Sequence, residues 1–464
     1  MTKGLLPFAG LLLALLWSSP VRGASFSPCE DAGTRASLAT SLCTREAVPL
    51  SHAPGFTGEQ LSLFVRKFPA DGPSKGTVWL IAGGPGESGA SLYPFIAQLR
   101  RSFHGFDLLV PDHRGTGFSS RLCPAEEAAS SPGGMALAGA EWASCFKGLN
   151  EQPERAREFT ITNAAYDLRQ LILRHRDGKP AHVYAVSYGT QLVLRALQIG
   201  ELPVAGLVLD SLVPLETSGE WDLSRRSLVV DDVGRQVLAR CDADPQCAAM
   251  LGEPAADLVR RLLASNTPHA RLLPRLMGRL LDVPTLRARI PWLLRDLSQG
   301  GSDEMARMTT GLLDAGAALG GYVQSPPSIP LVSIVSASEN KLRPNLSAAA
   351  LKAEEAPLLF SSPLPGLLIQ PGLPLYAKDS YFGRHPARLP PTLVFAGTLD
   401  PKTHYKGAVE HVAALRGAGS ITLVEVAGAP HFILWTAPGC FEHHAGAFVA
   451  GPGQPRADTA CALR

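Results

Sequence analysis

The sequence has little net charge and lacks the patterns of nucleic-acid and cofactor binding. Its 464 residues carry a formal net charge of +2, and no block of Lys and Arg occurs. So small a balance gives no electrostatic reason to expect nucleic acid or an anionic membrane as a partner. No HExxH or comparable ligand spacing, no P-loop and no dinucleotide-binding glycine pattern is present. We therefore expect neither a metal nor a cofactor.

Apolar runs long enough to span a membrane are also missing. The apolar stretch from Leu5 to Trp17 follows Lys3 and falls short of the ~20 residues that a spanning helix needs. Ser18, Ser19 and Pro20 end this stretch. The pattern predicts a signal peptide over residues 1–23, cleaved after Gly23. The alternative is an uncleaved anchor helix. We expect a secreted or periplasmic protein without stable membrane insertion, and both compartments stay open.

Metal-type CxxC pairs are absent among the eight cysteines. An even number of cysteines in an exported protein suggests disulfides, although many pairings are possible. The cysteines fall into four local pairs along the chain, so we expect these bonds: Cys29–Cys43, Cys123–Cys145, Cys241–Cys247 and Cys440–Cys461. The alternative is that some of them are buried free thiols.

Short apolar runs rich in Val, Leu and Ile predict the strands of a buried sheet. The first predicted strand, 60–68, alternates apolar and polar residues. The continuous apolar runs predict strands at 78–81, 108–110, 183–186, 207–209, 393–395 and 423–426. Helical patterns lie between several of them, for example over 164–175 and 191–198. Alternation of strands and helices predicts an α/β fold, with a mostly parallel sheet flanked by helices.

This alternation stops after Asp210 and resumes at Thr392. Predicted helices fill the gap, at 223–239, 256–263, 286–297 and 303–319. We interpret the gap as a mainly helical cap inserted between the two halves of the sheet. The expected organisation is a signal peptide at 1–23, core at 24–212, cap at 213–390 and core again at 391–464.

Ser187 is the candidate nucleophile. It follows a predicted strand and precedes a predicted helix, with Ala185 two residues before it and Gly189 two residues after. A sharp strand-to-helix turn that presents a serine needs small residues at these two positions. The alternative is a serine that only caps the helix.

Two further residues fit a catalytic triad in the order serine, acid, histidine. Asp400 and His431 each follow one of the last two predicted strands. His431 would take the proton of Ser187, and Asp400 would orient the imidazole. The run Gly83-Gly84-Pro85-Gly86 follows an early strand, so the amides of Gly84 and Tyr188 would form the oxyanion hole. The alternative for this run is a turn without function.

Taken together, these motifs resemble the prolyl iminopeptidase and tripeptidyl aminopeptidase group of serine peptidases with the α/β-hydrolase fold. The resemblance covers about 27–212 and 390–464, and it also includes Asp112-His113-Arg114-Gly115-Thr116-Gly117 and Ser187-Tyr188-Gly189-Thr190. It implies hydrolysis of a peptide bond near a free N-terminus. We interpret Asp112 and Arg114 as a structural ion pair that braces loops near the site.

The resemblance also implies that carboxylates, in the family from the cap, hold the substrate ammonium. Glu339 is the nearest match to such a family position, Glu216 is a second candidate at the cap entry, and Glu87 lies beside the oxyanion loop. A desolvated ammonium needs an anionic partner. The alternative for each of them is a solvated surface carboxylate.

Three functions remain compatible with the sequence. The first is an aminopeptidase that releases one to three residues from small peptides with a free N-terminus. The second is a carboxylesterase or other acyl hydrolase on the same triad, because fold and nucleophile do not fix the acyl group. The third is a binding protein on an inactive hydrolase scaffold. The preferred residue at the cleaved bond and the oligomeric state stay open.

Overall fold

The computed structural model describes residues 24–265, 267–369, 372–451 and 457–463. The expected signal peptide, residues 1–23, lies outside the described residues. Within the described ranges, no helix has both the length and the apolar character that crossing a membrane requires.

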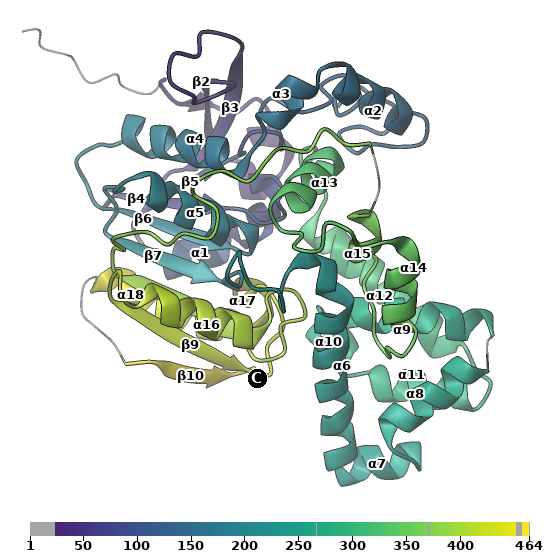
Figure 1. Cartoon of the computed structure of the whole chain (residues 1–464). Helices are drawn as coiled ribbons and strands as arrows, with labels where there is room; N and C mark the ends of the chain where they lie inside the picture. Colours follow the sequence, from purple (N-terminus) through teal and green to yellow (C-terminus); the bar gives the residue numbers. More distant parts are fainter. Residues whose placement is uncertain (1–23, 266, 370–371, 452–456, 464) are drawn as a thin grey trace, which may run out of the picture.

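A twisted sheet runs through the larger part of the molecule (Figure 1). In the described chain its strand order is β1-β2-β3-β5-β4-β6-β7-β8-β9-β10. The pairs β1·β2, β2·β3 and β3·β5 are antiparallel, and the others are parallel. The bounds are β1 Ser27–Pro28, β2 Leu42–Pro49, β3 Gln60–Phe68, β4 Thr77–Ile81, β5 Asp107–Pro111, β6 Ala181–Val186, β7 Gly206–Asp210, β8 Thr392–Gly397, β9 Ile421–Ala427 and β10 Thr459–Ala462.

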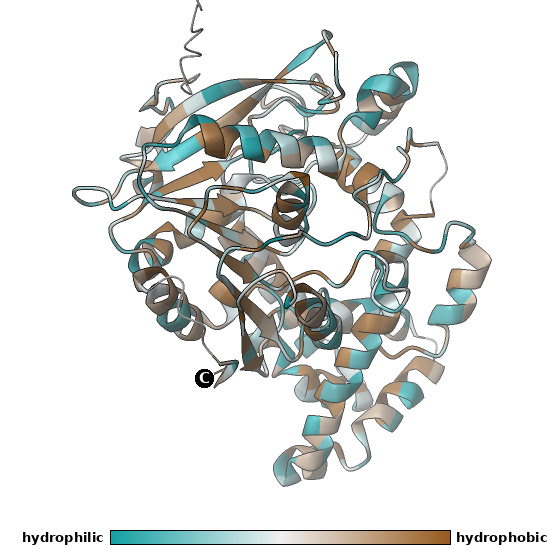
Figure 2. Cartoon of the chain, turned by 60° about the vertical axis from the view of Figure 1, so that its left-hand side comes forward, coloured by the Kyte–Doolittle hydropathy of each residue, from teal (hydrophilic) through white to brown (hydrophobic). Residues whose placement is uncertain are grey.

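Helices cover both faces of this sheet, which confirms the predicted fold class. Helices α4 (Ile161–Arg174), α5 (Tyr188–Ile199) and α16 (Tyr405–Leu415) share one hydrophobic core with one face. Helices α1 (Ile96–Ser102) and α18 (Pro438–Ala450) share another core with the opposite face. Strand β6 is buried on both sides, with Val183 and Ala185 in the first core and Tyr184 and Val186 in the second. In Figure 2 the strands in the middle of the sheet are largely brown, the colour of hydrophobic residues. The shorter elements of the core are η1 Ala32–Thr34, η2 Ala36–Leu38, η3 Gly89–Phe95, α2 Glu141–Glu151, α3 Pro153–Arg157 and α17 Ile433–Thr436.

A helical region occupies the chain between β7 and β8, and most of its helices form the lobe at the lower right of Figure 1, while α13 lies beside the sheet. It has a hydrophobic core of its own, built from α6, α8, α9, α11 and α12. Its elements are η4 Leu223–Arg225, α6 Arg226–Ala243, α7 Pro245–Leu251, α8 Ala255–Ala264, α9 Pro268–Leu280, α10 Pro284–Arg287, α11 Ile290–Ser298, α12 Asp303–Leu319, α13 Ile329–Ser338, α14 Ala348–Glu355 and α15 Leu364–Leu367. We call this region the insertion.

The structure contains disulfide bonds, each between cysteines that are neighbours along the chain. They join Cys29 to Cys43, Cys123 to Cys145, Cys241 to Cys247 and Cys440 to Cys461. Four disulfides are typical of a protein from an oxidising compartment, outside the cell or in the periplasm.

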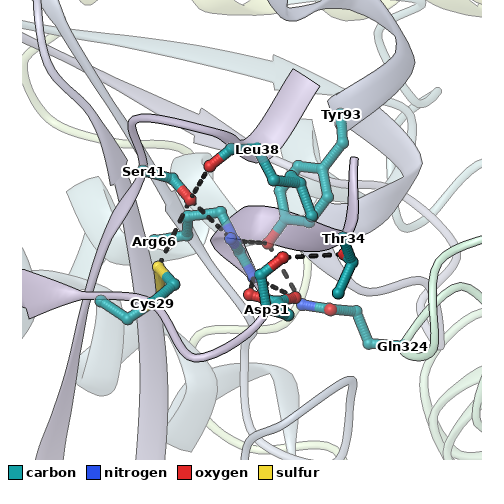
Figure 3. The surroundings of a disulfide bond; sticks show 9 residues. Cys29, Asp31, Thr34, Leu38, Ser41, Arg66, Tyr93 and Gln324 are labelled. Atoms are coloured by element: carbon teal, nitrogen blue, oxygen red, sulfur yellow. Dashed lines mark hydrogen bonds and ion pairs between the residues drawn. A yellow bond between two sulfur atoms is a disulfide. The ribbon is translucent and has the colours of Figure 1, made fainter. Parts of the chain in front are cut away.

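A buried arginine beside the first disulfide joins three distant parts of the chain (Figure 3). The guanidinium of Arg66 on β3 donates to both carboxylate oxygens of Asp31 at 2.7 Å and to the hydroxyl of Ser41 at 2.7 Å. It also donates to the hydroxyl of Tyr93, which accepts a second bond from Gln324 of the insertion at 3.1 Å. The N-terminal segment, the core and the insertion are thereby tied together.

Candidate active site

Ser187 occupies a strained turn between β6 and α5. Its φ of 55° lies in the left-handed region, which a non-glycine residue adopts only where the surroundings enforce it. Glycines make room for this turn. A Cβ at Gly189 would lie 2.7 Å from the carbonyl oxygens of Ile81 and Ala82, and one at Gly83 would lie 3.1 Å from the Cβ of Ser187. The serine is therefore held away from the regular backbone, in a position that exposes its hydroxyl.

Asp400 and His431 form a buried pair. Nδ1 of His431 lies 2.8 Å from Oδ2 of Asp400, which also accepts the hydroxyl of Thr403 at 2.7 Å. The other oxygen accepts the amides of Lys402 and Thr403 at 2.7 and 2.8 Å. Burial by itself would raise the pKa of Asp400, but the charge of His431 and these hydrogen bonds outweigh it and lower the pKa. Asp400 therefore stays ionised beside the imidazole.

Ser187 and His431 line the same cavity, whose volume is about 330 Å³. The hydrogen bonds of the described residues do not include one between these two side chains. Such contacts are often long in a site without substrate and shorten when substrate binds. The arrangement thus brings serine, histidine and aspartate to one place, at the carboxyl ends of β6, β9 and β8.

Asp210, a fully buried residue at the end of β7, fixes the loop that carries His431. Its carboxylate accepts the amides of Ile433 and Leu434 at 2.8 and 2.9 Å and the hydroxyl of Tyr184 at 3.1 Å. Burial raises the pKa of Asp210, although the two hydrogen bonds from the amides oppose the shift. Sequence analysis did not assign Asp210 a role. The available signal was an acidic residue directly after an apolar strand.

The glycine loop after β4 lies against both Ser187 and the insertion. Gly84 has a φ of 114°, and a Cβ there would lie 2.2 Å from the amide nitrogen of Gly86. The carbonyl of Gly86 accepts the amide of Ser328 from the insertion at 2.9 Å. Ser88, just beyond the loop, donates its hydroxyl to the carbonyl of Gln324 at 2.6 Å. The insertion therefore supports the backbone that faces the serine.

Two cavities lie beside Ser187, and both are lined by Gly84, Ser187, Leu223, Arg226 and Lys402. The histidine cavity, of about 330 Å³, also contains Glu87, Asp282, His431 and Trp435. The Glu216 cavity, of about 80 Å³, also contains Tyr188, Gln191, Glu216, Trp221 and Asn340. Both combine residues of the core with residues of the insertion.

The three candidate carboxylates have different surroundings. Glu87 is exposed at the histidine cavity, and no hydrogen bond or ion pair joins its side chain to another described residue. Glu216 lines its cavity and accepts Gln191 at 2.9 Å and Arg195 at 2.7 Å through one oxygen. Its second oxygen accepts the amide of Gly383 at 2.7 Å.

Glu339 is buried away from both cavities. Its carboxylate accepts Arg195 at 2.8 Å and the hydroxyl of Tyr376 at 3.0 Å. Burial raises its pKa, and the positive charge of Arg195 opposes this. Glu339 is absent from the residues that line the two cavities in the described chain. In this structure it fixes Arg195, which in turn binds Glu216.

The prediction of an ion pair between Asp112 and Arg114 is wrong. Arg114 binds both oxygens of Asp167 on α4, at 2.7 and 2.8 Å. Asp112 instead accepts the amides of Gly89 and Phe118, at 2.7 and 2.8 Å. Burial raises the pKa of Asp112 to about 6, although both amides lower it. The loop turns so that the two side chains point to different partners.

Two family models match the chain. The model for the alpha/beta hydrolase fold matches residues 76–248, and the model for TAP-like proteins matches residues 372–461. The chain therefore has the α/β-hydrolase fold. This confirms the expected resemblance, and the TAP-like match covers the part of the hydrolase that carries Asp400 and His431.

No curated protein matches this chain. Among solved structures, a thermophilic esterase from Thermogutta terrifontis is 14% identical over 88% of this chain and 98% of the other, with a TM-score of 0.39. A laboratory-evolved variant of potato epoxide hydrolase is 15% identical over 88% and 99%, also with a TM-score of 0.39. The esterase RhEst1 from Rhodococcus sp. ECU1013 is 15% identical over 89% and 99%, with a TM-score of 0.37. Similarities this weak say nothing about the substrate.

Proposed function

We propose that this α/β hydrolase is a serine aminopeptidase that releases one to three residues from peptide N-termini. The observation that carries the proposal is the 2.8 Å contact between His431 and Asp400, in a site whose cavity also contains Ser187. A strained serine, a buried histidine–carboxylate pair and a glycine loop are the parts that acyl transfer needs.

In the proposed mechanism, Ser187 attacks the carbonyl carbon of the scissile bond while His431 takes its proton. Asp400 stabilises the imidazolium, and the amides of Gly84 and Tyr188 donate to the oxyanion. His431 then gives the proton to the leaving amine, which departs and leaves an acyl-enzyme. Water, activated by His431, hydrolyses this ester and restores the serine.

Recognition of a free N-terminus is the finer part of the proposal. Glu216 and Glu87 line the cavities beside Ser187 and can receive an ammonium group. Residues of the insertion, such as Leu223 and Arg226, line the same cavities, and the insertion would thereby favour short peptides over internal chain segments. The TAP-like match supports a peptide rather than an ester substrate.

We also propose that the protein is exported through a signal peptide cleaved near Gly23 and acts in the periplasm or the medium. The disulfides support an oxidising compartment. We further propose 213–390 as a cap between core segments 24–212 and 391–464. Sequencing the mature N-terminus after export tests the cleavage site, and a mature protein that begins at Met1 would contradict it.

The decisive experiment compares tripeptidyl anilides with a free N-terminus, the same compounds after N-acetylation, and short-chain esters. We expect cleavage of the free peptides only. In Glu216→Gln, KM for these peptides should rise. Equal cleavage of free and acetylated peptides contradicts the aminopeptidase. Hydrolysis of the esters alone makes the protein a carboxylesterase. Ser187→Ala is the control for contaminating activity.

A further inference from the structure

Arg226 is a cation in the active site that the proposed mechanism does not use. It begins α6 of the insertion and lines both the histidine cavity and the Glu216 cavity, next to Ser187. The side chain is half-buried. In the described parts of the chain, no hydrogen bond or ion pair joins it to another residue. Its guanidinium is therefore open to whatever enters the cavities.

The two carboxylates whose charges act on Arg226, those of Asp400 and Asp282, have other partners. Asp400 accepts hydrogen bonds at both oxygens and holds His431. Asp282 forms an ion pair with Lys402, with 3.2 Å between nitrogen and oxygen. Burial lowers the pKa of Arg226, while Asp400 and Asp282 oppose that shift. The guanidinium stays charged at neutral pH, and no carboxylate of the described residues forms an ion pair with it.

The chemistry of a guanidinium defines the missing partner. A cation shielded from bulk water is unfavourable unless an anion accompanies it. The planar fork of arginine donates two parallel hydrogen bonds to a carboxylate, which gives both affinity and a fixed orientation. Since Arg226 and Ser187 line the same two cavities, an anion held there lies close to the scissile bond.

We infer that Arg226 binds a carboxylate of the substrate within one residue of the cleaved bond. The hydrolase would then prefer peptides with Asp or Glu at that point. That the cleaved bond is a peptide bond rests on the proposed aminopeptidase function. The charge preference itself needs only that Ser187 is the nucleophile. Lys402 adds positive charge to the same cavities, with Asp282 holding its ammonium.

The test compares matched peptides in two arms. One arm has Glu or Gln on the acyl side of the cleaved bond, and the other has Glu or Gln as the leaving residue. For the wild-type protein we expect kcat/KM to be about tenfold or more higher for Glu than for Gln in one arm, which locates the carboxylate. Arg226→Gln should bring this ratio close to one, and Arg226→Lys should keep part of it.

The matched control is Arg260→Gln, which removes a positive charge from the exposed surface of α8. It should leave the ratio of Glu to Gln unchanged. A ratio of about one in both arms of the wild-type protein overturns the inference. So does an equal ratio in wild type and Arg226→Gln.

A second measurement separates this inference from the aminopeptidase proposal. Phosphonate nitrophenyl esters that differ only in a carboxylate or carboxamide tail label an active serine without peptide hydrolysis. Faster labelling by the carboxylate probe in wild type but not in Arg226→Gln supports the inference even if no peptide is cleaved. Peptide cleavage with equal labelling by both probes supports the aminopeptidase and overturns the role of Arg226.

Discussion

The sheet and the insertion contribute to the active site in different ways. The sheet positions Ser187, Asp400 and His431 at the carboxyl ends of the parallel strands β6, β8 and β9, through backbone hydrogen bonds and glycine contacts. The insertion adds side chains such as Arg226 and Asn340, which line the cavities. We propose that the core determines which bond chemistry occurs, while the insertion selects what reaches it.

The largest expected effect lies in the core. Ser187→Ala removes the nucleophile, so kcat should fall by at least ~10³-fold. Steady-state kinetics on the best peptide substrate, with the variant purified away from any wild-type enzyme, measures this loss. Retention of most activity would show that Ser187 is not the nucleophile, and it would contradict the catalytic role assigned to the core.

A second substitution in the core tests the turn rather than the nucleophile. Gly189→Ala places a Cβ against two carbonyl oxygens of the loop after β4. We expect a loss of about 1–3 kcal/mol in the free energy of unfolding and about a tenfold fall in kcat, because the displaced turn misplaces Ser187. Denaturant unfolding and kinetics check both.

Gly148→Ala on α2 is the control for this turn, since a Cβ there has no neighbour within 4 Å. It should leave stability equal to wild type or higher by about 0.5–1 kcal/mol, as expected for alanine in a helix. Equal behaviour of the two glycine variants would show that the turn is not strained.

The pH dependence of stability tests a buried carboxylate of the core, that of Asp112. The pKa of about 6 lies above its ordinary value because burial opposes ionisation, so the folded protein binds this proton more tightly than the unfolded chain does. The stabilisation is therefore present at low pH and is lost as the pH rises through about 6. Relative to Asp112→Asn, the wild type should lose about 3 kcal/mol of stability between about pH 4 and pH 7.

Urea unfolding of both proteins at several pH values measures this difference. Asp71→Asn, at a side chain that is 83% exposed, is the matched control and should show no such trend. A difference between wild type and Asp112→Asn that stays constant with pH would contradict the assignment of this titration to Asp112.

The smallest effect on activity belongs to the insertion. Replacing Cys241 and Cys247 by Ser opens a bond that spans 6 residues, for which chain entropy predicts a loss of about 2 kcal/mol. The same change at Cys29 and Cys43 opens a bond that spans 14 residues, for a loss of about 3 kcal/mol. Because neither bond reaches the triad, kcat should change by less than about twofold. A collapse of activity in the first variant would contradict the division of roles.

The sequence predicted the strands well where they are buried on both faces of the sheet. Strands such as β4 and β6 appear as continuous apolar runs, so the order of Ser187, Asp400 and His431 after strand ends was predictable. Strand β2 was missed, because two of its inward positions are Thr44 and Glu46. Glu46 is buried against Arg174, a partner that lies far away in the chain.

Long-range polar partners and prolines account for most of the other differences. Arg195 contacts Glu339 across 144 positions, so the buried role of that glutamate has no local signal. Helices α9 and α13 were not predicted because prolines lie in or next to them. Both begin with a proline in the first turn, where its missing N–H breaks no helical hydrogen bond.

The central claim is that Ser187 is the nucleophile that His431 and Asp400 activate. Treatment of the mature protein with a fluorophosphonate, followed by peptide mass spectrometry, tests it most directly. We predict one adduct, on Ser187, formed quickly in the wild type and far more slowly in His431→Ala and Asp400→Asn. Labelling of a different residue, or labelling of Ser187 at the same rate in all three proteins, would contradict the account.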